Sequence, residues 1–238
     1  MKQQVQAWMV VGALAGAGWA LPASAAELVQ NGSLTQTNAS GFLLPQNNDV
    51  PPGWQKDIGT VDVNLVGYNA GLPVHVSPFP RYAVEGVAAS PDGGTWVGMA
   101  REPGPDPLRI NNERFKQTVT GFLPGQTYAV RWLAANFGSN PPGTANDYLG
   151  ANAVEVFIDG ASIGAGATLD LGPDWVHEQR LFTATATQHV LMFGTRDAVR
   201  SYLSIDGISV TAVPEPAPAV LLLSGLVALA WRRHRMQR

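Results

Sequence analysis

Hydrophobic and polar residues alternate along much of this chain, and this period of two constrains the fold more than any other feature. In the segment 60–66, Val61, Val63 and Leu65 alternate with polar residues, and the segments 127–134 and 153–158 repeat the pattern. Such alternation is typical of β-strands with one buried face. No comparable helical stripe occurs between residues 27 and 212. The pattern therefore predicts an all-β domain.

Several other segments have the same character. Further strands are expected at 28–30, 95–100, 115–122, 177–184, 189–193 and 202–210. The dipeptide Asp159-Gly160 is a strong hairpin signal. Short strands separated by Gly, Pro and Asn turns favour an antiparallel β-sandwich of two packed sheets, as in a jelly roll. The long loops 45–53, 101–112 and 136–152 are expected at the sheet ends, where ligands are usually met.

The N-terminal residues 1–26 have the order of parts found in a secretory signal peptide. Lys2 precedes an almost wholly apolar run from Ala7 to Leu21, and small residues follow at Ala23 and Ala25. This order predicts export, with cleavage near Ala25 or Ala26.

The C-terminal residues 213–238 differ sharply from the chain before them. The sequence Val213-Pro214-Glu215-Pro216 precedes an apolar run at 217–231 and a basic tail at 232–238. Fifteen helical residues span roughly 22 Å, against a hydrocarbon core of about 30 Å. Trp231 and the arginine stems would cover part of this difference by snorkelling. The positive-inside rule places the arginines, which are Arg232, Arg233, Arg235 and Arg238, in the cytoplasm, so the preceding domain faces outward.

The three parts of this tail, in this order at the C-terminus, resemble the PEP-CTERM sorting signal. The resemblance implies a protein exported through the inner membrane of a Gram-negative bacterium. It also implies a transient membrane anchor and processing near the Pro-Glu-Pro motif by an exosortase, a membrane-embedded cysteine transpeptidase. Proteins of this kind are associated with exopolysaccharide and biofilm matrix. The mature protein is then expected at the cell surface or in the extracellular matrix.

The segment between the two signals, residues 27–212, is acidic and lacks cysteine. It has ten Lys and Arg against seventeen Asp and Glu, so its net charge is 10 − 17 = −7. Such a surface repels phosphate backbones, which argues against a nucleic-acid partner. The absence of cysteine excludes thiol catalysis and cysteine-ligated zinc. Oxygen ligands for Ca²⁺ remain available among the carboxylates.

No catalytic motif is found in the sequence. The stretch from His177 to Leu181 resembles the start of a zinc-protease helix, but it lacks the second histidine and has a strand pattern. The carboxylate pairs Glu102 with Asp106 and Asp170 with Asp174 support glycoside hydrolysis only weakly. We therefore expect a protein that is not an enzyme.

Four stretches resemble, in order, the galactose-binding-like jelly rolls that include carbohydrate-binding modules of the family 4 and 9 type. They are LVQNGSL from Leu28, PPGW from Pro51, FKQTVTGFLPGQTYAVRWLAA from Phe115 and YLSIDGISV from Tyr202. The resemblance implies a structural Ca²⁺, held by a carboxylate that matches Asp206 and by oxygen ligands near Asn31. The first strand of the family usually ends in glutamate, whereas this chain has Thr35.

The last expected strand contains an interruption at Asp206. Its apolar residues Leu203 and Ile205 are followed by Ile208 and Val210, so the alternation slips by one residue across Asp206-Gly207. This slip predicts a β-bulge. An ionised aspartate there needs a partner, which is either Ca²⁺ or the backbone amides of the bulge.

Aromatic rings beside turn residues are the candidates for stacking on sugars. They are Trp54, Tyr68, Trp96, Tyr148 and Trp175. The leading interpretation is an exported, non-catalytic protein that binds or organises exopolysaccharide. The alternatives are a protein-binding scaffold or adhesion module without glycan binding and, less well supported, a glycoside-active enzyme.

Overall fold

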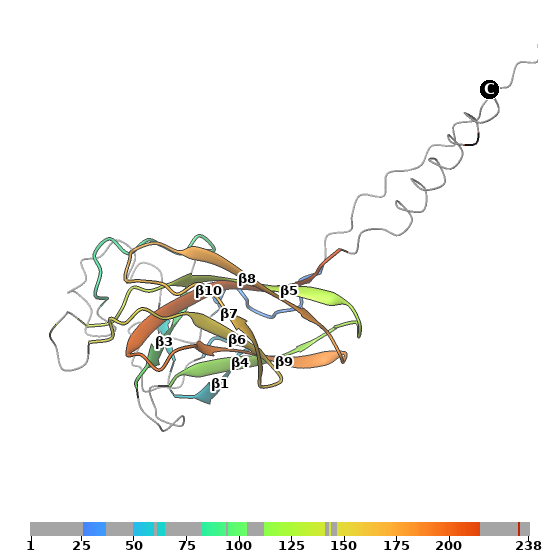
Figure 1. Cartoon of the computed structure of the whole chain (residues 1–238), viewed down its shortest axis with the longest axis horizontal. Coiled ribbons are helices and arrows are strands. Elements are labelled where there is room, and N and C mark those ends of the chain that lie inside the picture. The colour runs from blue at the N-terminus through green and yellow to red at the C-terminus, as the bar shows by residue number, and fades with distance from the viewer. Residues whose placement is uncertain are drawn as a thin grey trace, which may run out of the picture.

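The computed structural model describes residues 26–36, 50–59, 61–64, 82–93, 95–103, 112–140, 143, 147–214 and 233. Within them, two five-stranded antiparallel sheets pack face to face (Figure 1). The first sheet contains, in spatial order, β1 (Gln55–Ile58), β4 (Arg114–Thr120), β9 (Gln188–Thr195), β6 (Val154–Ile158) and β7 (Ala161–Ala165). The second sheet contains β2 (Asp62–Asn64), β3 (Trp96–Arg101), β10 (Ser201–Ala212), β5 (Thr127–Ala135) and β8 (Val176–Thr183). The predicted all-β sandwich is confirmed.

The core between the sheets is built from the inward-facing residues of the alternating strands. On β5, Val130 and Trp132 are fully buried, and Phe115 of β4 stacks on Phe193 of β9 with ring centroids 5.8 Å apart. The Trp132 ring lies 6.0 Å from Phe193 and so joins the two sheets. Burial of such large apolar side chains is the main stabilising contribution to a sandwich without disulfides.

Two local predictions are confirmed by backbone geometry. Asp159 and Gly160 both have positive φ, 51° and 81°, in the turn between β6 and β7, as a two-residue type I′ hairpin requires. On β10, Asp206 pairs with Leu133 but Ser209 pairs with Arg131, so two residues oppose one at this point. The slip at Asp206-Gly207 is therefore a β-bulge.

Other expectations need correction or lie outside the described residues. The segment 28–30 is not a strand, because only the Leu28 amide bonds to the β10 backbone, at Val210. Strands β1 and β7 were not expected, because neither shows clear alternation. Most of the leader and most of the tail, including the run 217–231, lie outside the described residues. Among the residues that are described, no helix is long and apolar enough to cross a membrane.

Strand β8 lies at the edge of the second sheet and carries two charged side chains on its inner face. Glu178 pairs with Trp132 and Arg180 with Val130, so both charges point toward the interior side of the sandwich. The Glu178 carboxylate accepts a hydrogen bond from the Ala167 amide at 2.8 Å, and the Arg180 guanidinium donates to the Ala165 carbonyl. These contacts close the gap between β8 and the chain around β7.

A second apolar cluster covers part of the outer face of the second sheet. The segment 82–93, here called the strap, lies over β3 and β10 and contributes Tyr82 and Val87 to this cluster. The Trp96 ring is fully buried beneath it, and its indole nitrogen donates to the Tyr82 hydroxyl at 3.0 Å. The Ala83 amide ties the strap to the Phe137 carbonyl at 3.0 Å. The strap thus converts one half of an exposed sheet face into a small second core.

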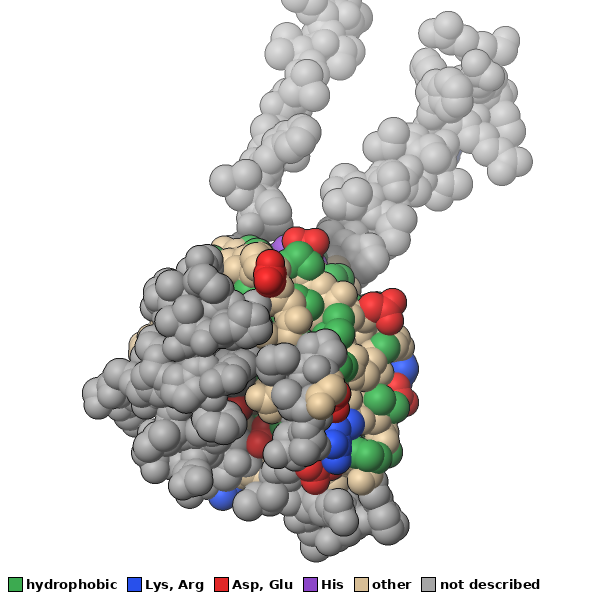
Figure 2. Space-filling model, turned by 90° about the vertical axis from the view of Figure 1, so that its left-hand side faces the viewer, with side chains coloured by type: hydrophobic (Ala, Val, Ile, Leu, Met, Phe, Trp, Pro, Cys, Tyr) green, Lys and Arg blue, Asp and Glu red, His purple; other side chains and the backbone are tan. Residues whose placement is uncertain are grey.

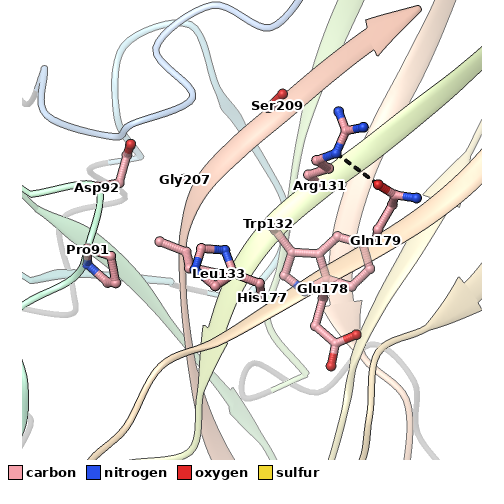
Figure 3. A pocket seen from close by; sticks show the side chains of 10 residues that line it. All are labelled: Pro91, Asp92, Arg131, Trp132, Leu133, His177, Glu178, Gln179, Gly207 and Ser209. Atoms are coloured by element: carbon pink, nitrogen blue, oxygen red, sulfur yellow. Dashed lines mark hydrogen bonds between the residues drawn. The ribbon is translucent and has the colours of Figure 1, made fainter. Parts of the chain in front are cut away.

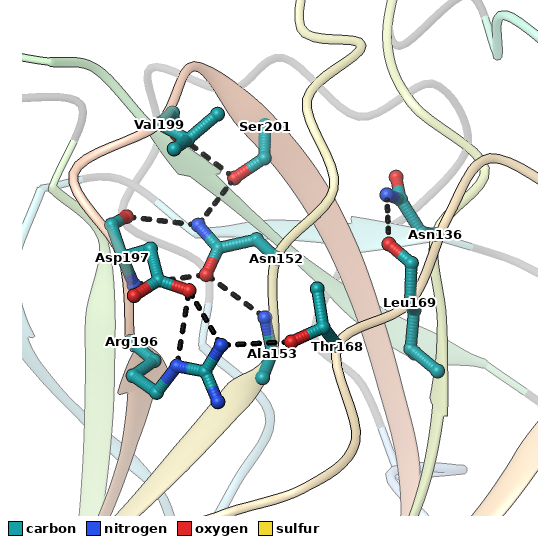
Figure 4. A network of polar contacts seen from close by, with 9 residues as sticks. All are labelled: Asn136, Asn152, Ala153, Thr168, Leu169, Arg196, Asp197, Val199 and Ser201. Atoms are coloured by element: carbon teal, nitrogen blue, oxygen red, sulfur yellow. Dashed lines mark hydrogen bonds and ion pairs between the residues drawn. The ribbon is translucent and has the colours of Figure 1, made fainter.

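A fully satisfied polar residue holds one end of the sandwich together. Asn152 is completely buried, and its amide nitrogen donates to the Asp197 carbonyl and the Ser201 hydroxyl, at 2.9 and 2.8 Å (Figure 4). Its amide oxygen accepts from the backbone amides of Ala153 and Asp197. Because every polar atom of this side chain has a partner, Asn152 serves the fold and fixes the turn that leads into β10.

Candidate functional site

A groove of about 470 Å³, here called the outer groove, lies on the outer face of the second sheet. Strands β10, β5 and β8 form its floor and the strap forms one wall (Figure 3). Its lining residues are Pro91, Asp92, Arg131, Trp132, Leu133, His177, Glu178, Gln179, Gly207 and Ser209. Most of the side chains are polar or charged, which suits a ligand rich in hydroxyl groups.

The bulge on β10 shapes the floor of the outer groove. Gly207 has a φ of 55°, and a Cβ at this position would meet the Leu133 side chain at 3.0 Å and the Asp92 Cβ at 3.5 Å. A side chain at residue 207 would therefore crowd Leu133 on the neighbouring strand and strain the backbone of the bulge, so glycine suits this position. After the bulge, Ser209 points to the outer face beside Arg131.

Arg131 lies at the centre of the polar part of the outer groove. It pairs with Ser209 of β10 on one side and with Gln179 of β8 on the other. Its Nε donates to Gln179 Oε1 at 2.8 Å, and its Nη1 donates to Thr211 Oγ1 at 2.8 Å. Two hydrogen bonds from neighbouring strands therefore orient the guanidinium, although the side chain is exposed.

Asp206 lies buried on the outer face of the second sheet, beneath the strap and beside the outer groove. The residue is completely buried, and neither carboxylate oxygen has a hydrogen-bond partner among the described residues. Burial raises the pKa of Asp206 to about 7, and the nearby Ser90 hydroxyl and Gly207 amide offset only part of this shift. Asp206 is thus as deeply buried as Asn152, but its carboxylate forms no hydrogen bond of normal geometry within the described residues.

A second buried carboxylate lies on the same sheet face. Asp62 on β2 is 8% exposed and accepts a hydrogen bond from the Tyr202 hydroxyl at 2.8 Å. Burial raises the pKa of Asp62 to about 6, and the Tyr202 hydrogen bond lowers it in part. Tyr202 lies directly over Gly98, which pairs with both Asp62 and Ser204. The outer face beneath the strap is therefore rich in buried acid groups.

The resemblance implied Asp206 and Asn31 as ligands of a Ca²⁺, and their contacts in the structure differ. Asp206 offers two unpartnered oxygens, which suits a cation ligand. The Asn31 side chain is used locally, because its nitrogen donates to the Gln36 and Pro52 carbonyls and its oxygen accepts from the Gln36 amide. The described residues contain no group of three or more Asp, Glu or His side chains that could hold a metal. Calcium binding stays a prediction that rests on Asp206 alone.

Two of the proposed sugar-stacking rings are buried in the two apolar clusters. Trp54 is 5% exposed and packs 4.9 Å from Phe115, and Trp96 is fully buried under the strap. Neither ring therefore presents a face to a sugar. Both were chosen because turn residues precede them, but burial between non-local neighbours outweighs that local signal.

The other candidate rings are held at the rim of the second cluster. Trp175 is half-buried, lies edge-on to Trp96 at 5.6 Å and donates to the Ala88 carbonyl at 3.0 Å. Tyr148 is half-buried, donates to Glu102 at 2.9 Å and has the Arg200 guanidinium 5.7 Å from its ring centroid. Burial, with Glu102 adding to it, raises the pKa of Tyr148 to about 12. Tyr68 lies outside the described residues.

The sorting-signal residues are described only at their start. The Val213 amide donates to the Thr127 carbonyl, and its carbonyl accepts from the Gln126 side chain, both at 2.9 Å. Pro214 and Arg233 are exposed. Glu215, Pro216, Trp231, Arg232 and Arg235 lie outside the described residues. The sandwich thus continues through Val213, one residue into the motif.

The polar residues of the outer groove were not among the candidates from the sequence. Alternation on β5 does place Arg131 opposite Val130 and Trp132, facing outward. What the sequence lacks is any signal that Gln179 and Thr211, which lie 48 and 80 residues away, border the same guanidinium. The acidic character expected from composition is visible on the surface in Figure 2, where Asp and Glu side chains lie at several separate places.

No family model matches this chain, and no curated protein matches it. Among solved structures, it is similar to a cyclase from Fischerella sp. TAU in complex with 4-(1H-indol-3-yl)butan-2-one, with a TM-score of 0.54 and 16% identity over 81% of this chain and 100% of that chain. This similarity supports the sandwich fold.

Two carbohydrate-binding modules are also similar at a lower level. One is described as "CBM4 structure and function", with a TM-score of 0.40 and 17% identity over 78% of this chain and 99% of that chain. The other is TmCBM61 in complex with β-1,4-galactotriose, with a TM-score of 0.39 and 11% identity over 68% of this chain and 90% of that chain.

Proposed function

We propose that this chain is an exported, non-catalytic protein that binds extracellular polysaccharide in the outer groove. The observation that carries the proposal is the groove itself, where the side chains of Arg131, Gln179 and Ser209 from three adjacent strands face one open hollow. Sugar hydroxyls act both as donors and as acceptors, and a guanidinium, an amide and a hydroxyl together satisfy both needs. The low-level similarity to carbohydrate-binding modules is consistent with the proposal but does not carry it.

The route to the cell surface is the second part of the proposal. The leader at 1–26 directs export, and the tail at 213–238 holds the protein in the inner membrane of a Gram-negative bacterium until an exosortase processes it. This part is supported by the order of the motif, the apolar run and the arginine cluster. After processing, the domain takes its place at the cell surface or in the extracellular matrix. Ca²⁺ at Asp206 would stabilise the fold and take no part in sugar contact.

A glycan array probed with the purified full-length chain tests the binding function. Ser209→Trp should fill the outer groove and abolish the array signal, because this residue lines the floor. The matched control is Thr118→Trp, on the exposed outer face of the first sheet, which should leave the signal unchanged. Binding that survives Ser209→Trp would place the glycan elsewhere. An empty array, combined with attachment to matrix proteins, would favour the scaffold or adhesion alternative.

A further inference from the structure

Within the described residues, the Arg131 guanidinium lacks the carboxylate partner that two other arginines, Arg114 and Arg196, have. Arg114 is paired with Asp57 at 3.0 Å and Arg196 with Asp197 at 2.7 Å. The two side chains that hold Arg131, Gln179 and Thr211, are both neutral, and no carboxylate forms an ion pair with Arg131 in the described part of the chain. Its positive charge is therefore oriented by the sheet but not neutralised by it.

The donors of Arg131 are only partly used. Nε and Nη1 each donate one hydrogen bond, while Nη2 donates none within the described residues. A guanidinium has five N–H donors in a planar fork. The remaining donors are consequently available to an acceptor that enters the outer groove. Since the two existing bonds already fix the plane of the fork, little side-chain freedom is lost when a ligand binds.

The acidic residues of the outer groove do not face Arg131 directly. In Figure 3, Asp92 and Pro91 lie on the strap side, whereas Arg131 and Gln179 lie together on the other side. Glu178 belongs to the inner face of β8, and one of its oxygens is occupied by the Ala167 amide. The groove thus has an acidic end at the strap and a basic end at Arg131.

We propose that the basic end of the outer groove binds the carboxylate of an acidic sugar, so that the natural ligand is a uronate-containing polysaccharide. This inference rests on the proposed glycan-binding function and specifies its ligand class. The planar fork of Arg131 matches a carboxylate, and charge-assisted hydrogen bonds are about twice as strong as neutral ones. Gln179 and Ser209, on either side, are placed to bond the ring hydroxyls of the same sugar unit.

The overall charge of the chain makes this contact specific. With a net charge of 10 − 17 = −7 over residues 27–212, the domain repels a polyanion at long range. Non-specific adsorption of a polyuronate is therefore unfavourable. Any measured affinity for one must come from short-range contacts such as the one at Arg131.

The test uses the full-length chain and hexamers of galacturonate, mannuronate and guluronate, each with its carboxyl-reduced neutral counterpart. Isothermal titration should show that at least one uronate hexamer binds about tenfold more tightly than its reduced form. Arg131→Gln should remove this preference, so that the variant binds the charged and the reduced hexamer with affinities that agree within about twofold. Arg131→Lys should retain part of the preference, because it keeps the charge but loses the fork. The control Arg114→Gln, on the other sheet, should change neither affinity.

The outcomes separate this inference from the function on which it rests. Equal affinity for charged and reduced hexamers overturns the acidic ligand class but leaves glycan binding in the groove intact. A preference that survives Arg131→Gln overturns the role of Arg131. No binding to any hexamer overturns the ligand class, and an empty glycan array would then remove the function as well. Melting curves of each variant establish that a lost preference does not come from an unfolded protein.

Discussion

The His189 imidazole contacts the Asp159 carboxylate in the β6–β7 turn, with Nδ1 2.6 Å from the carboxylate oxygen. His189 Nε2 accepts hydrogen bonds from the Thr185 and Ala186 amides, each at 3.2 Å. An Nε2 that accepts carries no proton, so Nδ1 bears the hydrogen that is donated to Asp159. The ring also lies edge-on to Phe122 at 5.2 Å and its side chain is 2% exposed. His189 therefore links the β6–β7 turn to the β8–β9 turn, and these contacts are here called the clasp.

Removal of the His189 side chain should lower the stability of the domain. We expect His189→Ala to lower the free energy of unfolding by about 3 kcal/mol, because it leaves a cavity beside Phe122 and several unpaired polar groups. Urea denaturation measures this change. His177→Ala, which removes an exposed imidazole, serves as the control and should change stability by less than about 0.5 kcal/mol. Similar losses for both variants would contradict the clasp.

Asp206 should make the fold less stable as the pH rises. Its folded pKa of about 7 lies above the unfolded value near 3.9, so the folded state holds a proton that the unfolded state has lost between these values. Stability then falls with rising pH across this window, by at most about 1.4 kcal/mol per unit, and levels off above pH 7. Asp62, whose pKa burial raises to about 6, adds to this loss of stability only in the lower part of the pH window.

The variant Asp206→Asn isolates this effect. In the presence of a chelator, we expect it to match the wild type at pH 5 and to exceed it by about 2 kcal/mol at pH 8. Urea denaturation at pH 5, 6, 7 and 8 provides the comparison, and the histidines contribute equally to both proteins. A constant difference across the series would show that Asp206 does not titrate in this range.

If Asp206 is a ligand of Ca²⁺, the bound cation should offset the loss of stability that an ionised, buried Asp206 causes. Because a ligand that binds only the native state stabilises it by mass action, Ca²⁺ at about 100 times its dissociation constant should raise the melting midpoint by about 5–10 °C. Melting curves at pH 8 with Ca²⁺ and with a chelator make the measurement. Equal midpoints, or an Asp206→Asn variant that still responds fully, would end the calcium prediction.

Gly98 should not tolerate a side chain. A Cβ at this position would overlap the Tyr202 ring and hydroxyl, so Tyr202 would have to move away from Asp62. We expect Gly98→Ala to cost about 3 kcal/mol in urea denaturation, from overpacking and from the loss of the hydrogen bond to a buried carboxylate. Gly172→Ala, where a Cβ would meet nothing within 4 Å, is the matched control. Equal tolerance of both substitutions would be incompatible with the packing of Tyr202.

The sorting signal can be tested apart from the fold. Replacement of Pro214-Glu215-Pro216 by alanines should leave the circular dichroism of the domain unchanged, because the last strand ends at Ala212. It should also increase the mass of the protein recovered from cells, since the tail would no longer be removed. An unchanged mature mass would refute processing at this motif.

Local features of the fold were predictable because they depend on neighbouring residues. Alternation predicted the strands around Val130 and Val156. The Asp159-Gly160 pair predicted the β6–β7 turn, and the slip at Asp206 predicted the bulge. These signals need no knowledge of which strands pair. For the same reason, the sequence assigned an outward face to Arg131 without indicating its function.

Features that depend on distant residues were not predictable. Trp96 looked accessible beside a Gly-Gly-Thr turn, but the aperiodic strap covers it with Tyr82. The groove arises only when β10 and β8 flank β5, and this order brings together segments from separate parts of the chain. Period-two patterns specify faces of strands, whereas the identity of the neighbours is fixed by packing of the whole sandwich.

The charged side chains on the inner face of β8, Glu178 and Arg180, also affect whether two copies of this protein can associate through their sheet edges. An open sheet edge is a template on which a second molecule can add a strand, and repeated addition produces aggregates. At the β8 edge, such addition would enclose Glu178 and Arg180 and compete with their bonds to the chain around β7. The inward charges therefore disfavour the addition of a strand from a second copy at the β8 edge.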